Sequence, residues 1–506
     1  MKQIKIGIIL NYVSIVLTFV IGLIYTPFLI RTLGQNDYGL YAFVFAIAGY
    51  LAILDIGIGN SIVRYISSNT VSGDKEKEKR IIGYFFKLFS YVAVLTLILG
   101  ILIAFNIEVI VSNNFPNDSL YTLKWMILIL TFNFALGFIF NTFASVIQAY
   151  EKYIFLKVLN VVRTLAVPIF STIALFNTQN LVLLTLILFI VNSIVSICYF
   201  VYYKRVLRLS LSFEELNKDF KKEIFSYAVI IFIVAIADKM YWQTDQILLG
   251  ILKSPEDVAI YAVAIQFVNI FMSLSLAISN VFLPRITKIV NAEHYSVTEI
   301  NILYIKVSKY QTFVMGLAFS GFIILGRDFI ELWVGPKYEL AYFLVVILMS
   351  TFFIDLIQNL GLTVMQAKGK YSFRAYTLII CAVLNVIISV PIIKIYGSIG
   401  TAYITAAFIL LGNVIILNIY FHSVLKLNML KYWNEIGRII LIIVLITLVS
   451  KIFVINLDIN TWIMFFSVSL VYLAIYVVFL FLFYASIAEK KKIISHIKSV
   501  NFRIKR

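Results

Sequence analysis

Long apolar runs recur along almost the whole chain, from Ile6 to Phe483, and they constrain the fold more than any other feature. Each run is close to the roughly 20 residues that an α-helix needs to cross the hydrocarbon core of a bilayer. Strands of a membrane β-barrel would instead alternate apolar and polar residues over about ten positions. No such alternation occurs, so the sequence predicts an all-α polytopic membrane protein.

The composition supports this class. Only 13% of the residues are charged and the mean hydropathy is +0.98, whereas a soluble domain carries about 25% charged residues. The net charge of +17 could indicate nucleic-acid binding. That function needs a basic patch on a folded soluble surface, and no stretch here is long enough for one, so no nucleic-acid partner is expected.

Hydropathy and turn-forming residues divide the chain into fourteen predicted membrane segments. They are residues 6–30, 39–66, 81–106, 122–149, 157–176, 181–203, 224–252, 258–284, 310–325, 340–366, 375–393, 398–420, 439–457 and 461–484. Of the 42 Lys and Arg residues, 31 fall between segments on the side that holds both termini, and seven on the other side. The positive-inside rule therefore predicts that both termini are cytoplasmic.

An internal repeat sets the predicted domain organisation. Residues 148–155 read QAYEKYIF and residues 366–373 read QAKGKYSF, which is five matches in eight positions at an offset of 218. The offset spans six helices, an even number, so the two copies share one orientation and should form a substrate cavity where they meet. The expected parts are a six-helix lobe, a cytoplasmic linker, a second six-helix lobe, two added helices and a basic cytoplasmic tail, at residues 1–203, 204–223, 224–420, 421–484 and 485–506.

Four short stretches carry a family resemblance. They read TPFLIRTLG (26–34), DYGLY (37–41), LDIGIGN (54–60) and TDQILLG (244–250). With the fourteen segments, the chain resembles the multidrug/oligosaccharidyl-lipid/polysaccharide exporter superfamily, and within it the polysaccharide-biosynthesis branch of O-antigen (Wzx-type) flippases. The resemblance implies a V-shaped bundle in a bacterial inner membrane that works by alternating access. It also implies an undecaprenyl-pyrophosphate-linked oligosaccharide as cargo, and polysaccharide polymerase machinery as a partner beside the membrane lipids.

One cluster of polar residues lies deep in the seventh predicted segment. An ionisable side chain inside a membrane costs at least about 2.5–3.5 kcal/mol, so it is a functional candidate. Lys239 lies fifteen residues into the segment, with Asp238 beside it, Asp245 seven residues on, and Tyr241 and Trp242 between. The functional interpretation is a polar and aromatic stripe that binds phosphate and sugar. The structural alternative is an ion pair that only stabilises helix packing.

Two further carboxylates, Asp55 and Asp355, lie near the middle of their predicted segments. Desolvation makes a carboxylate easier to protonate, so either could couple transport to proton movement. The alternative for each is a carboxylate held by a hydrogen bond from a neighbouring helix.

Three cations lie within about two helical turns of the predicted inner surface: Arg64, Lys87 and Arg163. Long cationic side chains at this depth usually extend to the interface. All three belong to the first predicted lobe, and if they face inward they would form a ring that receives a pyrophosphate, since Arg binds phosphate in a bidentate manner and Lys acts as a point charge.

Other functions fit the sequence less well. A cation-coupled multidrug exporter or a peptidoglycan lipid-precursor flippase of the same superfamily is the main alternative, but the first segment has neither a carboxylate nor an arginine before Arg31. A polysaccharide polymerase, ligase or membrane glycosyltransferase is disfavoured because all loops are short, and the only adjacent acidic residues on the predicted outer side, Glu256 and Asp257, lie in a five-residue turn. The P-loop pattern is absent, so no nucleotide is expected to drive transport. The three histidines are scattered and the two cysteines are unpaired in any motif, so no metal and no cofactor are expected.

Overall fold

The structure is a computed structural model that describes residues 2–55, 58–111, 115–218, 243–290, 296–454 and 457–483, with isolated positions between 218 and 243. All regular elements in these ranges are helices, and eleven of them are long and apolar enough to cross a membrane. The prediction of an all-α polytopic protein is confirmed. Two of the eleven helices each cover two predicted segments, and segment 224–252 lies mostly outside the described residues, so the count of fourteen stays a prediction.

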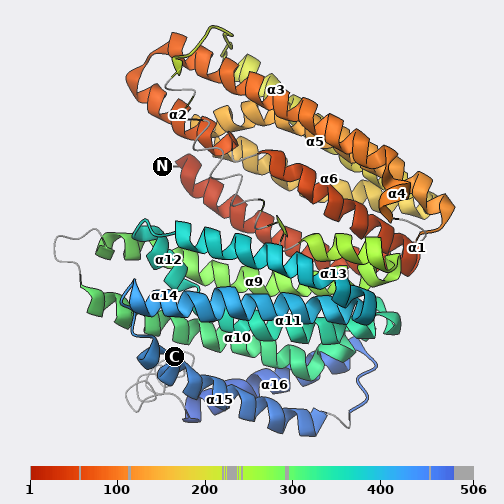
Figure 1. The fold of residues 1–506 in the computed structure, drawn as a ribbon, viewed down its shortest axis with the longest axis vertical. Coiled ribbons are helices and arrows are strands. Elements are labelled where there is room, and N and C mark those ends of the chain that lie inside the picture. The colour runs from red at the N-terminus through yellow and green to blue at the C-terminus, as the bar shows by residue number, and fades with distance from the viewer. Residues whose placement is uncertain are drawn as a thin grey trace, which may run out of the picture. The chain divides into compact units, whose positions relative to one another are not determined.

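The chain divides into two compact units, each described by itself (Figure 1). Unit 1 comprises Met1–Ala262 and Ala382–Thr401, and unit 2 comprises Val263–Cys381 and Ala402–Arg506. The predicted six-helix lobes have different boundaries and stay a prediction.

Unit 1 is built mainly from seven α-helices and two short helical turns. They are α1 (Lys2–Ala52), η1 (Ile53–Asp55), α2 (Ile58–Ser72), α3 (Lys75–Phe105), α4 (Ile107–Val111), α5 (Asn117–Ala149), α6 (Tyr153–Asn177), α7 (Leu181–Val201) and η3 (Tyr202–Val206). Helix α5 is central, because both α3 and α7 pack against it, while α1 packs against α6.

Unit 2 contains most of the later elements. They are α9 (Pro255–Val290), α10 (Val297–Val334), η4 (Pro336–Tyr338), α11 (Glu339–Ile357), α12 (Leu360–Ala367), α13 (Ser372–Ile409), η5 (Leu410–Ile416), α14 (Leu417–Ser423), α15 (Met429–Val454) and α16 (Trp462–Phe483). Its long helix α10 packs against α11, α15 and α16. The start of α9 and the middle of α13 belong to unit 1.

Glycine interrupts two of the long helices between predicted segments. Gly34 in α1 has φ 81° and Gly397 in α13 has φ 59°, a backbone region that other residues rarely adopt. Gly34 falls between the first two predicted segments and Gly397 between the eleventh and twelfth. Each long helix is therefore two helical arms joined at a glycine.

The outward faces of the helices are apolar. Phe105, Phe176 and Ile463 are 63%, 77% and 82% exposed, and many other large apolar side chains are also exposed. In water such a surface would aggregate, whereas in a bilayer it contacts lipid tails. The described chain is thus built for a lipid solvent.

The internal repeat recurs in the three-dimensional structure. After α5 and after α12 the chain turns through a residue with positive φ, Glu151 (56°) and Gly369 (67°), which are 218 residues apart. The rings of Phe155 and Tyr202 stack with centroids 4.0 Å apart, and so do Phe373 and Tyr420 at the same offset. The sequence similarity therefore reflects a repeated local structure.

The first part of the predicted linker is docked on unit 1. Residues 207–217 form no helix or strand, and their leucines pack against the core formed by α2, α3 and α5. The Ser212 N–H donates to the carbonyl of Lys79 at 3.0 Å, and Arg80 forms an ion pair with Glu214 at 2.7 Å. A Cβ on Gly83 would lie 1.9 Å from the Ser212 carbonyl oxygen, so this glycine allows the close approach.

Candidate functional site

A polar pocket of about 360 Å³ lies inside unit 1, between η1, α5, α6 and α7. Half of its lining side chains are polar, although the helices that supply them are apolar enough to span a membrane. The polar ones are Asp55, Asn133, Asn141, Arg163, Asn192, Ser196 and Tyr199. Aromatic and small residues complete the wall: Ala52, Phe134, Gly137, Phe138, Phe140, Ala144 and Val195.

Two amide hydrogen bonds shape the pocket. Asn141 Nδ2 of α5 donates to Asp55 Oδ1 at 3.1 Å, and Asn192 Nδ2 of α7 donates to Asn133 Oδ1 of α5 at 2.9 Å. The Oδ1 atom of Asn192 is buried and accepts no hydrogen bond from any described residue. A buried acceptor without a donor costs about 1–3 kcal/mol, so the pocket offers a place for a ligand hydroxyl or N–H.

Helix α6 adds a cation. Arg163 lines the pocket, and its Nη2 donates to Asn160 Oδ1 at 2.9 Å, one helical turn earlier. The remaining guanidinium hydrogens can bind an anionic group such as phosphate. The structure thus brings together two predicted site residues, Asp55 and Arg163, which are 108 positions apart in the sequence.

The other predicted cations of this group lie elsewhere. Arg64 and Lys87 are exposed and do not line the pocket. Arg64 lies over the ring of Tyr65 at 5.6 Å, and Lys87 over Tyr91 at 6.0 Å. Of the three cations predicted to form a ring, only Arg163 lines this pocket. A phosphate-binding role for Arg64 and Lys87 stays a prediction.

The predicted stripe around Lys239 is only partly described. Lys239 is half-buried, and Asp245 is 3% exposed and accepts a hydrogen bond from Tyr261 Oη at 2.6 Å. Asp238, Tyr241 and Trp242 lie outside the described residues. The role of the stripe stays a prediction.

Asp355 lies in a closed polar network of unit 2. Asn413 Nδ2 donates to Asp355 Oδ2 at 3.1 Å, and Gln358 Nε2 donates to the Asn413 carbonyl at 2.8 Å. Asn418 Nδ2 donates to Gln358 Oε1 at 2.7 Å, and Asn418 Oδ1 accepts from Trp433 Nε1 at 2.8 Å. Asp355 and Asp55 thus each accept a hydrogen bond from an asparagine, as the structural alternative predicts, and proton coupling by either stays a prediction.

Sequence reasoning missed the asparagines of the pocket, because it followed charged residues alone. A signal was present: Asn133, Gly137 and Asn141 are spaced four residues apart, as are Asn192 and Ser196. This spacing places each set on one helix face. Polar or missing side chains on one face of an apolar helix indicate a cavity or a close contact.

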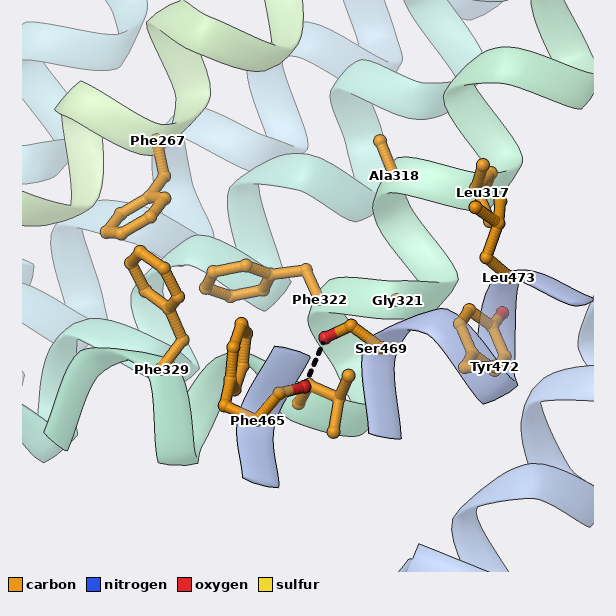
Figure 2. Close-up of a pocket in the computed structure, with 12 residues that line it drawn as sticks. Phe267, Leu317, Ala318, Gly321, Phe322, Phe329, Phe465, Ser469, Tyr472 and Leu473 are labelled. Carbon is orange, nitrogen blue, oxygen red and sulfur yellow. Dashed lines mark hydrogen bonds between the residues drawn. The ribbon is translucent and has the colours of Figure 1, made fainter. Parts of the chain in front are cut away.

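A second cavity of about 360 Å³ is apolar and lies in unit 2 (Figure 2). The rings of Phe267, Phe322, Phe329 and Phe465 gather at one end, and Phe267 lies 5.3 Å from Phe322 and 5.6 Å from Phe329 between centroids. Ala318 and Gly321 of α10, which have small or no side chains, also line the cavity. Such a surface suits an apolar chain.

Comparison with known proteins assigns the architecture to a family. The polysaccharide biosynthesis protein family matches residues 4–290, more than half of the chain. The chain belongs to this family. It is a multi-pass membrane transporter of the polysaccharide biosynthesis family, as the resemblance in the sequence indicated.

Two curated relatives are similar over part of their length. The uncharacterized membrane protein EpsK of Bacillus subtilis is 22% identical over 337 residues, 65% of either chain. The probable flippase AglR of Haloferax volcanii is 25% identical over 220 residues, which cover 42% of this chain and 44% of AglR. Both matches span less than two thirds of the relatives' lengths.

Solved structures show the fold of this family member. The lipid II flippase MurJ in an inward closed conformation has a TM-score of 0.75 at 16% identity, over 95% of this chain and 99% of MurJ. An inward-facing MATE multidrug resistance transporter has a TM-score of 0.59 at 14% identity, over 85% of this chain and 98% of its own. At these identities the likeness concerns the fold and not the cargo.

Proposed function

We propose that this polysaccharide biosynthesis family member is a flippase. It translocates an undecaprenyl-pyrophosphate-linked oligosaccharide from the cytoplasmic to the outer leaflet of a bacterial inner membrane by alternating access, and has both termini in the cytoplasm. The observation that carries the proposal is the polar pocket of unit 1, which places an arginine, a carboxylate and three asparagines inside membrane-spanning helices.

The chemistry of the pocket matches the head group of such a lipid. Asparagine amides and a carboxylate bind hydroxyl and N–H groups, and a guanidinium binds phosphate oxygens. Aromatic walls favour the apolar faces of sugar rings. The apolar cavity between α10 and α16 would accommodate part of the prenyl chain. On the outer side the product would pass to polysaccharide polymerase machinery.

The alternatives are a cation-coupled multidrug exporter and a peptidoglycan lipid-precursor flippase. A site for cationic drugs should carry an excess of negative charge, whereas this pocket pairs the carboxylate of Asp55 with the guanidinium of Arg163. A peptidoglycan precursor has the same kind of head group, a pyrophosphate bearing sugars, so the pocket would serve both. The name of the relative AglR, a probable flippase, supports transport of a lipid in either case.

The test uses purified protein in liposomes. A fluorescent prenyl-pyrophosphate oligosaccharide is placed in both leaflets, and flipping is measured as loss of protection from an external sugar oxidant. We expect Arg163→Ala to slow flipping more than tenfold. Arg438→Ala, an exposed arginine of α15, should flip at the wild-type rate. Export of a cationic dye without any flipping by the wild type would assign the chain to the multidrug exporters.

The Lys239 stripe is tested in the same assay. If Lys239 binds the pyrophosphate, Lys239→Ala should abolish flipping without changing protein level or membrane insertion. If Lys239→Ala flips the lipid at the wild-type rate, the stripe only stabilises helix packing.

A further inference from the structure

Several of the positions that line the polar pocket in the first repeat carry different residues in the second repeat. At the offset of 218, Gly137 and Val195 of the pocket correspond to Asp355 and Asn413. Phe140 corresponds to Gln358. In unit 1 these positions line an open cavity, whereas in unit 2 their counterparts are bound to one another by hydrogen bonds. The same place in the fold is open in one copy and filled in the other.

The open copy has unused space and unused hydrogen-bonding capacity. A Cβ on Gly137 would meet no atom of the described structure within 4 Å. Asn192 Oδ1 is buried without a donor among the described residues, and Leu410 stands at the corresponding position of the second copy. An empty wall and an unpaired acceptor point to a ligand that brings both volume and a hydrogen-bond donor.

The size and chemistry of the pocket narrow the ligand class. A volume of about 360 Å³ is at the low end for ligand sites, which range from about 300 to 1,000 Å³. It therefore suits a sugar ring and not a whole oligosaccharide. Asn133, Asn141 and Asn192 are neutral amides, so they read hydroxyl and N–H groups without requiring charge on the ring.

We propose that the pocket of unit 1 is a subsite for one neutral sugar ring of the cargo, present in the first repeat only. This proposal rests on the proposed function. Asn192 Oδ1 accepts from a ring hydroxyl or acetamido N–H, and Gly137 leaves the space for the ring. Arg163 at the rim holds the adjoining phosphate. The second repeat has no such subsite, because Asp355, Gln358 and Asn413 occupy its volume.

The test compares two lipids in detergent: bare undecaprenyl pyrophosphate, and the same lipid carrying one N-acetylhexosamine. Wild-type protein should bind the sugar-bearing lipid about tenfold more tightly, the order expected for hydrogen bonds to buried acceptors. Gly137→Leu fills the pocket, and Asn192→Leu copies the second repeat. Both should reduce the tenfold difference between the two lipids to less than twofold.

Gly437→Leu is the matched control. Gly437 is also a helical glycine whose Cβ would meet nothing within 4 Å, and it lines neither cavity, so this variant should keep the tenfold difference. Equal binding of both lipids by the wild type, or an undiminished difference in Gly137→Leu, overturns the subsite while flipping stands. A wild type that binds neither lipid and exports a cationic dye overturns the flippase proposal itself.

Discussion

Glu151 has a left-handed backbone conformation, which a glycine adopts at the corresponding position of the second repeat. Its φ is 56°, and the φ of Gly369 is 67°. Both residues close the same turn: Glu151 N–H donates to the Gln148 carbonyl at 2.9 Å and Gly369 N–H to Gln366 at 3.1 Å. A side chain in this left-handed region costs roughly 1–2 kcal/mol, so the first repeat carries a strain that the second avoids.

Glu151→Gly should therefore raise the free energy of unfolding by about 1 kcal/mol. The measurement is chemical unfolding in detergent. Lys152→Gly is the control, because Lys152 has an ordinary φ of −82°. There a glycine adds only freedom to the unfolded chain and should lower the free energy of unfolding by roughly 0.5–1 kcal/mol. Equal effects of the two variants would contradict the strain at Glu151.

A buried carboxylate near the same turn depends on one hydroxyl. Glu78 is 5% exposed, and Tyr150 Oη donates to its Oε1 at 2.5 Å. Tyr150→Phe should lower the free energy of unfolding by about 1–3 kcal/mol, because the carboxylate loses a buried donor. Tyr121→Phe, at an exposed position, should change it little.

The effect of Tyr150→Phe should also depend on pH in one direction. Burial, and then the hydrogen bond and negative charge of Glu78, raise the pKa of Tyr150 above its ordinary value. The stability that the proton confers is therefore complete below about pH 10, the pKa of an unfolded tyrosine. It is lost as the pH rises through the raised pKa. The difference between wild type and variant should be constant at neutral pH and shrink only in strong alkali.

At the residue level, the charge of Asp55 and Arg163 was enough to predict them as site residues. The neutral residues of the pocket could not be predicted in this way. The depth of a charged residue in an apolar segment can be read from the sequence. The pairing of Asn192 with Asn133 cannot, because it depends on α7 lying beside α5. The asparagine spacing indicates a polar face but not which faces meet.

At the level of elements, one substitution in α3 should detach the docked segment 207–217 from the helices that it contacts. Gly83→Ala would place a Cβ 1.9 Å from the Ser212 carbonyl oxygen, a distance at which the segment must move. We expect trypsin to cleave at Arg208 and Lys218 at least several-fold faster in this variant, while α3 remains helical because alanine favours helix. Gly137→Ala, in open space, is the control. Unchanged cleavage in Gly83→Ala would show that the docked segment does not protect these sites.

Helix positions followed from the sequence better than helix lengths did. The ninth segment was predicted at 310–325, whereas α10 extends from Val297 to Val334. Hydropathy detects the part of a helix that lies in lipid, and charged ends such as those of α10 continue beyond it. The segment predicted at 39–66 is interrupted at 53–55 by η1, where Asp55 enters the pocket. The docking of 207–217 was unforeseen, because the charged residues of 204–223 led to the prediction of a cytoplasmic linker.

At the level of the whole molecule, the charge asymmetry predicts a topology that reporter fusions can check. Fusions after Lys253 and Lys337 should be external, and fusions after Gly73 and Asn217 internal. Gly73 joins α2 to α3, and Lys337 lies in η4 between α10 and α11, so both fusions interrupt turns and leave the helices whole. An internal signal at Lys337 from a stably inserted fusion would reverse the predicted orientation of unit 2.

The closed network around Asp355 and the open wall at Gly137 have a consequence for how such a duplicated chain evolves. One copy is committed to folding, since each of its side chains there satisfies another, and drift at any of them exposes a buried group. In the other copy a side chain added at Gly137 would meet no described atom within 4 Å, so residues at that wall can change at a smaller cost in stability. Divergence among members of the lineage should thus concentrate in the first half, where altered specificity carries the smaller penalty in stability.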